Sequence, residues 1–325
     1  MVRDTKLVTG GAGFIGSHLT EKLLNDGHRV TVLDNFSAGK TENLQHLQTS
    51  KKLTVIKEDL KKPNELQQII DECDVIYHLA ANPEVRLEQV SPKTHFEENI
   101  LATFNLLEAL RKTGTPKTFV FASTSTVYGD AEIVPTPENY APLKPISTYG
   151  ASKLACEALI TSYAYTFNHQ ALILRLANII GPHSTHGVIY DFIKKIHTNP
   201  KQLTILGDGN QTKSYMHITD CINATTHLTK TLQKNQEKVD TYNLGSNDKI
   251  TVKQIAHIIA QTMNTPKIKL AYTGGIDGGR GWKGDVKTMQ LSINKLLQTG
   301  WKPTYTSKQA VQLTAKTLKQ EITPT

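Results

Sequence analysis

The stretch Thr9-Gly10-Gly11-Ala12-Gly13-Phe14-Ile15-Gly16 decides the fold of this chain. Apolar residues 7–9 before it predict a short strand, and the amphipathic residues 15–25 after it predict a helix. Its glycines fit the pattern G-x-G-x-x-G, in which a tight turn lets the backbone approach a pyrophosphate at the helix N-terminus. Three glycines can also form a turn without a ligand, but their place between a strand and a helix favours a dinucleotide site.

Apolar and amphipathic segments go on alternating through the first half of the chain. Strands are expected at 29–33, 53–56, 75–79, 117–123 and 171–176, and helices at 65–70, 96–112 and 149–167. This alternation predicts an α/β fold with a Rossmann-like, doubly wound parallel sheet. After Gly181 the pattern is less regular, with helices expected at 188–197 and 252–261 and a glycine-rich loop at 274–284. We expect a dinucleotide-binding Rossmann domain at 1–176, with a return around 212–245, and a smaller C-terminal α/β substrate domain at 177–325.

The composition is typical of a soluble globular protein, with 38% hydrophobic and 20% charged residues. No apolar run is long enough to span a bilayer, and the first six residues leave no room for a signal peptide before the first strand. Cys73, Cys156 and Cys221 form no CxxC pair, which predicts a reducing compartment, the cytoplasm.

The net charge of +8 comes from 37 basic and 29 acidic residues. It suits a phosphorylated substrate or a nucleic acid, but the lysines are dispersed, so we predict a solvated surface and no nucleic-acid partner. His183 and His186 have no nearby carboxylate or cysteine to complete a metal site, so we predict a polar loop and no metal.

Acidic and small residues close the next expected strands. Asp34 ends the second strand, where a carboxylate can accept both ribose hydroxyls and repels a 2′-phosphate, which favours NAD over NADP. Asp59 and Leu60 follow the third strand, at the adenine edge, although an aspartate that caps a turn is an equal interpretation. Leu79-Ala80-Ala81 ends the fourth strand and leaves space for a flat ring beside the backbone.

A pair of residues at the head of an expected helix indicates acid–base chemistry. Tyr149 and Lys153 are four residues apart, so both side chains lie on one helix face. The ammonium, with a cationic nicotinamide nearby, favours the phenolate, lowers the pKa of the tyrosine and makes it a base near neutral pH. Such a pair is also common on helix surfaces. Upstream, four hydroxyl residues, 123–126, end a strand on the side of the ligand crevice, where one can bridge Tyr149 to a substrate oxygen.

With these motifs, the chain resembles the extended short-chain dehydrogenase/reductase family, and within it the UDP-glucose 4-epimerases and related NAD-dependent epimerases and dehydratases. The resemblance covers essentially the whole chain. Its motifs are TGGAGFIGSHL, LDNFSAGK, HLAA, STSTVYGD, YGASK, RLANIIGP, LGDGNQTKSYMHITD and Thr299-Gly300-Trp301-Lys302-Pro303.

The resemblance implies a role for each matching residue. Thr124 is implied as the catalytic Ser/Thr, Tyr149 as the acid/base, and Lys153 as its partner, which also bonds the nicotinamide ribose. Asn99 is implied to support Lys153 through its backbone and a water. The implied cofactor-binding residues, besides Tyr149 and Lys153, are Gly10, Gly13, Phe14, Ile15, Gly16, Asp34, Asn35, Phe36, Ser37, Gly39, Asp59, Leu60, Leu79, Ala80, Ala81, Asn99 and Ala177.

The implied substrate-binding residues are Thr124, Tyr149, Asn178, Val188, Thr204, Leu206, Lys213, Tyr215, Arg280 and Asp285. Two of them depart from the family pattern. Lys213 stands where an arginine is usual, so a point charge replaces a bidentate fork. The R-x-G-D motif appears as Arg280-Gly281-Trp282-Lys283-Gly284-Asp285, so either Arg280 or Lys283 can take the arginine role. Met289, at the position that gates N-acetyl sugars, is neither small nor aromatic and leaves the sugar open.

The residues before V-Y-G separate the reactions of the family. Dehydratases and decarboxylases have a carboxylate there, whereas this chain has Ser125 and Thr126. An epimerase needs one acid/base group and a reversible hydride, so we predict epimerisation. The resemblance implies that the substrate is UDP-glucose/UDP-galactose and that the reaction runs at C4 through a 4-keto intermediate with NAD. Alternatives are a UDP-N-acetylhexosamine or UDP-uronate epimerase, a dehydratase or reductase, and a non-catalytic nucleic-acid-binding relative. The resemblance and two apolar faces of helix 149–167 predict a homodimer.

Overall fold

The chain packs as two compact units. The computed structural model describes residues 4–85, 91–282 and 284–323. Unit 1 comprises Met1–Val127, Pro145–Arg175 and Ile222–Tyr242, and unit 2 comprises Tyr128–Lys144, Leu176–Cys221 and Asn243–Thr325. Within the described ranges no helix is long and apolar enough to cross a bilayer. The expected division into a cofactor-binding range and a substrate-binding range stays a prediction.

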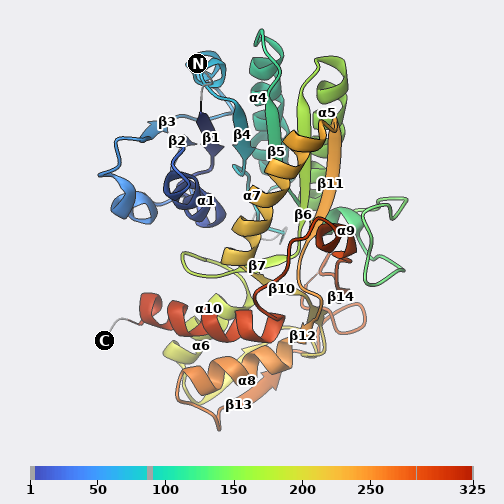
Figure 1. The fold of residues 1–325 in the computed structure, drawn as a ribbon. Helices are drawn as coiled ribbons and strands as arrows, with labels where there is room; N and C mark the ends of the chain where they lie inside the picture. The colour runs from blue at the N-terminus through green and yellow to red at the C-terminus, as the bar shows by residue number, and fades with distance from the viewer. Residues whose placement is uncertain (1–3, 86–90, 283, 324–325) are drawn as a thin grey trace. The chain divides into compact units, whose positions relative to one another are not determined.

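A seven-stranded sheet in the order β11-β6-β5-β4-β1-β2-β3 forms the centre of unit 1 (Figure 1). Its strands are β1 (Thr5–Thr9), β2 (Arg29–Asp34), β3 (Leu53–Lys57), β4 (Val75–His78), β5 (Thr118–Thr124), β6 (Gln170–Leu176) and β11 (Val239–Leu244). The pairs β1–β2, β2–β3, β1–β4 and β4–β5 are parallel. The strand order reverses between β1 and β4, which is where doubly wound sheets bind ligands. The predicted fold class is therefore confirmed.

Helical segments connect these strands. They are α1 (Phe14–Asn25), η1 (Thr41–Leu47), α2 (Leu66–Asp71), α3 (Pro92–His95), η2 (Phe96–Leu101), α4 (Ala102–Arg111), η3 (Ser125–Tyr128), α5 (Thr148–Thr166) and α7 (Ile218–Asn235). The expected helix 96–112 begins with a π-helical segment, η2, before α4. The sequence pattern missed α7 because it is rich in threonine, a poor helix former. Its buried hydroxyls bond the preceding turn, as from Thr229 Oγ1 to the Thr225 carbonyl at 2.8 Å.

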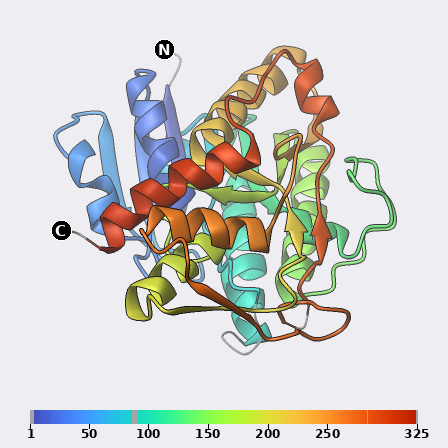
Figure 2. The same cartoon turned by 90° about the horizontal axis from the view of Figure 1, so that it is seen from below.

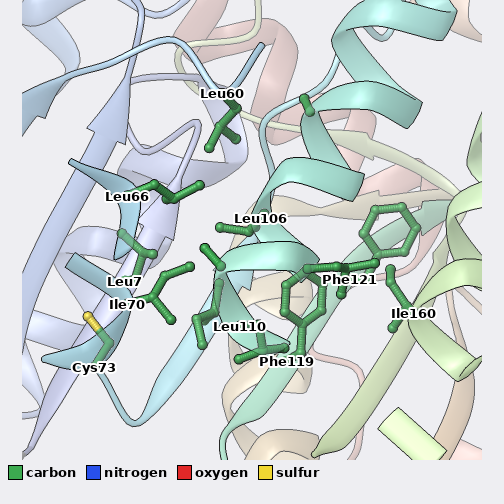
Figure 3. Close-up of a cluster of buried hydrophobic side chains, with 14 of the residues drawn as sticks. Leu7, Leu60, Leu66, Ile70, Cys73, Leu106, Leu110, Phe119, Phe121 and Ile160 are labelled. Atoms are coloured by element: carbon green, nitrogen blue, oxygen red, sulfur yellow. The ribbon is translucent and has the colours of Figure 1, made fainter. Parts of the chain in front are cut away.

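The hydrophobic core of unit 1 fixes the elements that carry the expected catalytic residues. All seven residues of β5 are buried, as expected for a strand covered on both faces. Figure 3 shows Phe119 and Phe121 of this strand beside Leu106 and Leu110 of α4 and Ile160 of α5. Each such side chain contributes about 1.5–3 kcal/mol by burial. The end of β5 and the first turns of α5, which carry the expected catalytic residues, therefore belong to elements that this core holds in place.

Three helices pack side by side in unit 2: α6 (Val188–Thr198), α8 (Val252–Thr262) and α10 (Ser307–Ile322) (Figure 2). Capping boxes begin α8 and α10, with Thr251 and Gln254 in the first and Thr306 and Gln309 in the second. The smaller elements are β7 (Asn178–Ile180), β8 (Gln202–Ile205), β9 (Thr212–Lys213), β10 (Tyr215–His217), β12 (Ile250–Thr251), β13 (Lys269–Tyr272), β14 (Thr288–Met289) and α9 (Asn294–Gln298).

Candidate active site

The turn between β1 and α1 admits only glycine at two positions. Gly10 has a φ of 68°, and a Cβ on it would lie 2.7 Å from the backbone nitrogen of Ala80. A Cβ on Gly16 would lie 2.1 Å from the carbonyl oxygen of Gly10. Gly13 is the N-cap of α1 and gives no side-chain hydrogen bond to its first turn. No side chain therefore caps the N-terminus of α1, and its first backbone N–H groups can bind a pyrophosphate.

The carboxylate of Asp34 is held beside this turn. Its Oδ2 accepts the N–H of Ala12 at 2.9 Å, and its Oδ1 accepts the N–H of Phe36 at 2.8 Å. A Cβ on Gly39 would lie 2.8 Å from the same Oδ2, so the neighbouring backbone approaches closely. A carboxylate has about four lone-pair sites, so two remain for the hydroxyls of a ribose. The residues present thus fit NAD.

At the end of β3, the structure shows the turn-capping role that was one interpretation of Asp59. Its Oδ1 accepts the N–H of Lys61 at 2.9 Å, and its Oδ2 accepts from Asn35 at 3.3 Å. Asn35 in turn accepts from the hydroxyl of Ser37 at 2.8 Å. The side chain of Leu60 packs into the core. Contacts of these residues and of Leu79-Ala80-Ala81 with a cofactor stay predictions.

The three expected catalytic side chains come together in unit 1. Thr124 ends β5, and its side chain lies beside the phenol of Tyr149, which is in the first turn of α5. Lys153, one turn later and 3% exposed, donates to the carbonyl of Ala122 at 2.8 Å. Its Nζ lies 4.5 Å from the ring centroid of Phe121. The arrangement places a phenol, a hydroxyl and an ammonium at one strand end.

Burial sets the ionisation of this pair. It raises the pKa of Tyr149 to about 12, and the nearby side chain of Thr124 offsets only part of that rise. It lowers the pKa of Lys153 to about 8, while the nearby Cys156 and Glu157 act in the opposite direction. Burial thus opposes the lowered pKa that the sequence predicts for Tyr149. A bound cofactor's positive charge would act with Thr124 against it.

A buried ion pair beside the catalytic residues was missed by the sequence reasoning. Glu157, on α5, accepts from the guanidinium of Arg175 on β6 at 2.7 Å and from the hydroxyl of Ser123 on β5. The only sequence signal is an arginine inside an apolar strand. The hydroxyl of Ser123 is thus held by Glu157, whereas the hydroxyl of Thr126 lies 3.1 Å from that of Thr124.

Asn99 joins two neighbouring segments of unit 1. Its Oδ1 accepts the N–H of Asn82 at 2.8 Å, and its Nδ2 donates to the hydroxyl of Ser152 on α5 at 2.9 Å. The implied support of Lys153 by Asn99 stays a prediction.

The cations implied to bind the substrate are paired within unit 2. The Nζ of Lys213 lies 2.6 Å from Oδ1 of Asp285 and 5.4 Å from the ring centroid of Trp282. Arg280 donates two hydrogen bonds of 3.0 Å to the carboxylate of Asp130 and a third to the carbonyl of Asp285. Lys283 lies outside the described residues. Both described cations thus meet a carboxylate of the chain itself.

The other implied substrate and cofactor residues of unit 2 belong to separate elements. Asn178, on β7, donates to the carbonyl of Ser214 at 3.1 Å. Burial raises the pKa of the Tyr215 phenol on β10. The carbonyl of Thr204 on β8 accepts from Lys195 at 3.2 Å. The remaining three are Ala177, which is buried, Val188 at the start of α6, and Leu206, which is 39% exposed. Their ligand contacts stay predictions.

Two curated relatives match most of the chain. An uncharacterized UDP-glucose epimerase of Bacillus subtilis is 37% identical over 88% of this chain and 90% of its own length. A UDP-glucuronic acid decarboxylase of Xenopus tropicalis is 30% identical over 98% of this chain and 73% of its own length.

Three solved structures share the fold over 98–99% of this chain and 99–100% of their own. A UDP-galactose 4-epimerase has a TM-score of 0.85 and 42% identity. A UDP-glucuronic acid 4-epimerase from Bacillus cereus, in complex with UDP-glucuronic acid and NAD, has a TM-score of 0.86 and 29% identity. A UDP-N-acetylglucosamine 4-epimerase from Methanobrevibacter ruminantium, in complex with UDP-N-acetylmuramic acid, has a TM-score of 0.85 and 29% identity.

The substrates in these names differ, whereas the fold of the three structures is shared, and the structure from Bacillus cereus holds NAD. The model of the NAD dependent epimerase/dehydratase family matches residues 6–245, which are most of the chain and include the glycine turn and the expected catalytic residues. The predicted cofactor, NAD, is therefore confirmed. This chain belongs to the NAD-dependent epimerase/dehydratase family, and it is an enzyme of that sugar-nucleotide class.

Proposed function

We propose that the protein interconverts UDP-glucose and UDP-galactose by epimerisation at C4. The observation that carries the proposal is the end of β5, where Thr124 lies beside the phenol of Tyr149 and the next residues, Ser125 and Thr126, carry no carboxylate. This strand end offers one acid/base group. A 4-epimerisation needs one, because the same oxygen can take and return the 4-hydroxyl proton.

Each catalytic residue has a distinct task in this reaction. NAD, when bound, supplies a reversible acceptor for the hydride of C4. Tyr149 accepts the proton of the 4-hydroxyl and later returns it to the 4-keto oxygen. Thr124, beside the phenol, orients it and shares the proton's path. Lys153, held by the carbonyl of Ala122, favours the phenolate by its charge in a buried setting.

Subunit association is part of the proposal. One face of α5, with Cys156 and Ile160, is buried in the core, while Ala151 and Ala158 on another face are exposed. Large apolar side chains near α4 and α5 are also exposed, with Phe96 at 56% and Tyr165 at 65%. Uncovered apolar surface of this kind supports a homodimer through these helices. Light scattering at micromolar concentration tests it, and a monomer mass would contradict it.

The place of action is proposed from the cysteines. All three are buried, and none lies near another in sequence, which supports a reducing compartment such as the cytoplasm. A leader removed from the native protein, found by mass spectrometry of the N-terminus, would contradict this.

The deciding experiment is turnover of a panel of UDP-sugars. The purified protein, with NAD in catalytic amount, is incubated with the UDP forms of glucose, galactose, their N-acetyl derivatives and glucuronate, and the products are resolved by NMR. We expect UDP-glucose and UDP-galactose to equilibrate without accumulation of NADH, and Tyr149→Phe to serve as the inactive control. Conversion of N-acetyl sugars or uronates alone, release of carbon dioxide, or NADH in proportion to product would reject the proposed reaction.

A further inference from the structure

His95 is a buried histidine that the proposed reaction does not use. It ends α3, directly before the π-helical segment η2, and is 1% exposed. Its ring packs against the ring of Tyr149, with centroids 5.9 Å apart and planes at 56°. The ring of His95 is thus in direct contact with the expected acid/base of the site.

The hydrogen-bond partners of His95 fix its tautomer. Its Nε2 lies 2.8 Å from the carbonyl oxygen of Glu84. A carbonyl only accepts, so Nε2 carries a hydrogen. In the neutral ring Nδ1 is then an acceptor, and it lies 2.8 Å from the hydroxyl of Thr148, the first residue of α5. His95 therefore donates to one segment and accepts from another, and the second is the immediate neighbour of Tyr149.

The segment that receives the hydrogen bond is the β4 loop, residues 80–85, which follows the carboxyl end of β4. Loops at this end of a doubly wound sheet border the ligand crevice. Asn99, four residues after His95, makes the same kind of link, because it bonds Asn82 of the β4 loop and Ser152 of α5. Two side chains from one helical stretch thus join the β4 loop to the first turns of α5. π-Helical segments such as η2 are frequent at functional sites.

We propose that His95 is a positioning residue for catalysis, which holds the ring of Tyr149 and the β4 loop in one fixed arrangement. The inference rests on the proposed function, in which Tyr149 is the acid/base. A displacement of about 1 Å at a reacting group costs about 10²-fold in rate. Loss of the two hydrogen bonds of His95 should therefore lower kcat more than it changes substrate or cofactor affinity.

The first test is a double-mutant cycle on turnover of the UDP-sugar. His95→Phe keeps the ring contact with Tyr149 and removes both hydrogen bonds, whereas Thr148→Val removes only the bond to α5. We expect His95→Phe to lower kcat about 10–100-fold, with KM and the dissociation constant of NAD changed by less than about threefold. Because the two variants share one bond, the double variant should resemble His95→Phe and not the product of the two losses.

The matched control is His169→Gln. His169 is also buried, at 3% exposed, but it lies at the amino ends of β5 and β6, where its Nδ1 accepts the N–H of Lys117 at 3.2 Å. It should leave kcat within about threefold of the unchanged protein. A kcat for His95→Phe in that range, an equal loss in His169→Gln, or losses that multiply in the double variant would overturn the proposal.

A second measurement decides the role of His95 even if no UDP-sugar is converted, in which case only the proposed function fails. Hydrogen exchange of the NAD-bound protein is compared between the β4 loop and residues 148–153 of α5. If His95 joins the two segments, His95→Phe speeds exchange in both, and His169→Gln in neither. Faster exchange in one segment alone, or in none, would overturn the link.

Discussion

The glycine turn of unit 1 and the paired cations of unit 2, the two places where we expect phosphate groups to bind, are built in different ways. The turn after β1 offers backbone N–H groups at a helix N-terminus and no charged side chain, and its shape is set by Gly10 and Gly16. In unit 2 the implied phosphate ligands are Lys213 and Arg280, and each already meets a carboxylate. The glycine turn thus has its shape before a ligand binds. In unit 2, by contrast, Lys213 and Arg280 would have to exchange a carboxylate for the phosphate.

The difference extends to burial. Beside the catalytic residues, Glu157 and Arg175 form an ion pair with side chains 6% and 8% exposed, whereas the side chain of Asp130, the partner of Arg280, is 49% exposed. Water and salt screen an exposed pair, so it is worth little and exchanges easily. A buried pair cannot lose one member without leaving a charge in a medium of low polarity. We therefore expect loss of the Glu157–Arg175 pair to be far more damaging than loss of the Arg280–Asp130 pair.

The largest effect should come from Tyr149→Phe, in the buried part of unit 1. The ring keeps its packing against His95, and only the oxygen that moves the proton is lost. General acid–base catalysis contributes about 10²–10⁴-fold, so we expect kcat to fall by that factor while NAD still binds. Steady-state kinetics and NAD titration check it, and a rate within a few-fold of the unchanged protein would refute the role of Tyr149. Thr124→Ala should be milder, because Thr126 offers a hydroxyl 3.1 Å from that of Thr124.

The sequence could predict the features whose residues lie close together in the chain. The glycine turn and the Tyr149/Lys153 pair each depend on residues within one or two helical turns of each other, and Asp34 is marked by its place at the end of an apolar strand, so a pattern indicates them. The buried pair depends on partners 18 residues apart on α5 and β6, and the pairing of Arg280 with Asp130 spans 150 residues. In the sequence, the buried pair is signalled only by an arginine inside an apolar strand, and no local pattern indicates the partner of either arginine. The raised pKa of Tyr149 was missed for a related reason, since burial is a property of the packed chain.

The second prediction is a loss of stability when the buried pair is broken. Glu157→Gln keeps the shape of the side chain but leaves the guanidinium of Arg175 buried and uncompensated. Breaking a buried pair costs about 3–5 kcal/mol, and urea unfolding should show a loss of that size. Glu157→Leu together with Arg175→Met should recover most of it, because both charges are then absent. A loss below about 1 kcal/mol for Glu157→Gln would contradict the prediction, because it would mean that the buried pair contributes no more than an exposed one.

The third prediction tests the shape of the glycine turn. Gly10→Ala places a Cβ 2.7 Å from the backbone of Ala80 at a φ of 68°, so the turn has to open. Overpacking of this kind costs about 1–3 kcal/mol, and we expect NAD to bind roughly 5–100-fold more weakly by calorimetry. Gly114→Ala is the matched control, since a Cβ there meets nothing within 4 Å. Equal NAD affinity in both variants would mean that the close approach at Gly10 does not shape the cofactor site.

The smallest effect is expected for Asp130→Asn in unit 2, and its sign is informative. The exposed pair with Arg280 contributes about 0–1 kcal/mol, so stability should change by no more than that. If Arg280 binds the substrate diphosphate, removing its competitor should lower KM for the UDP-sugar by about two- to fivefold at low salt, and salt should erase the gain. Asp208→Asn is the control, because Asp208 pairs at 3.3 Å with Lys287, which is not implied in substrate binding, and KM should not change. A higher KM in Asp130→Asn would mean that the pair holds the loop of Arg280 in its binding position, and unit 2 would then be as preorganised as the glycine turn.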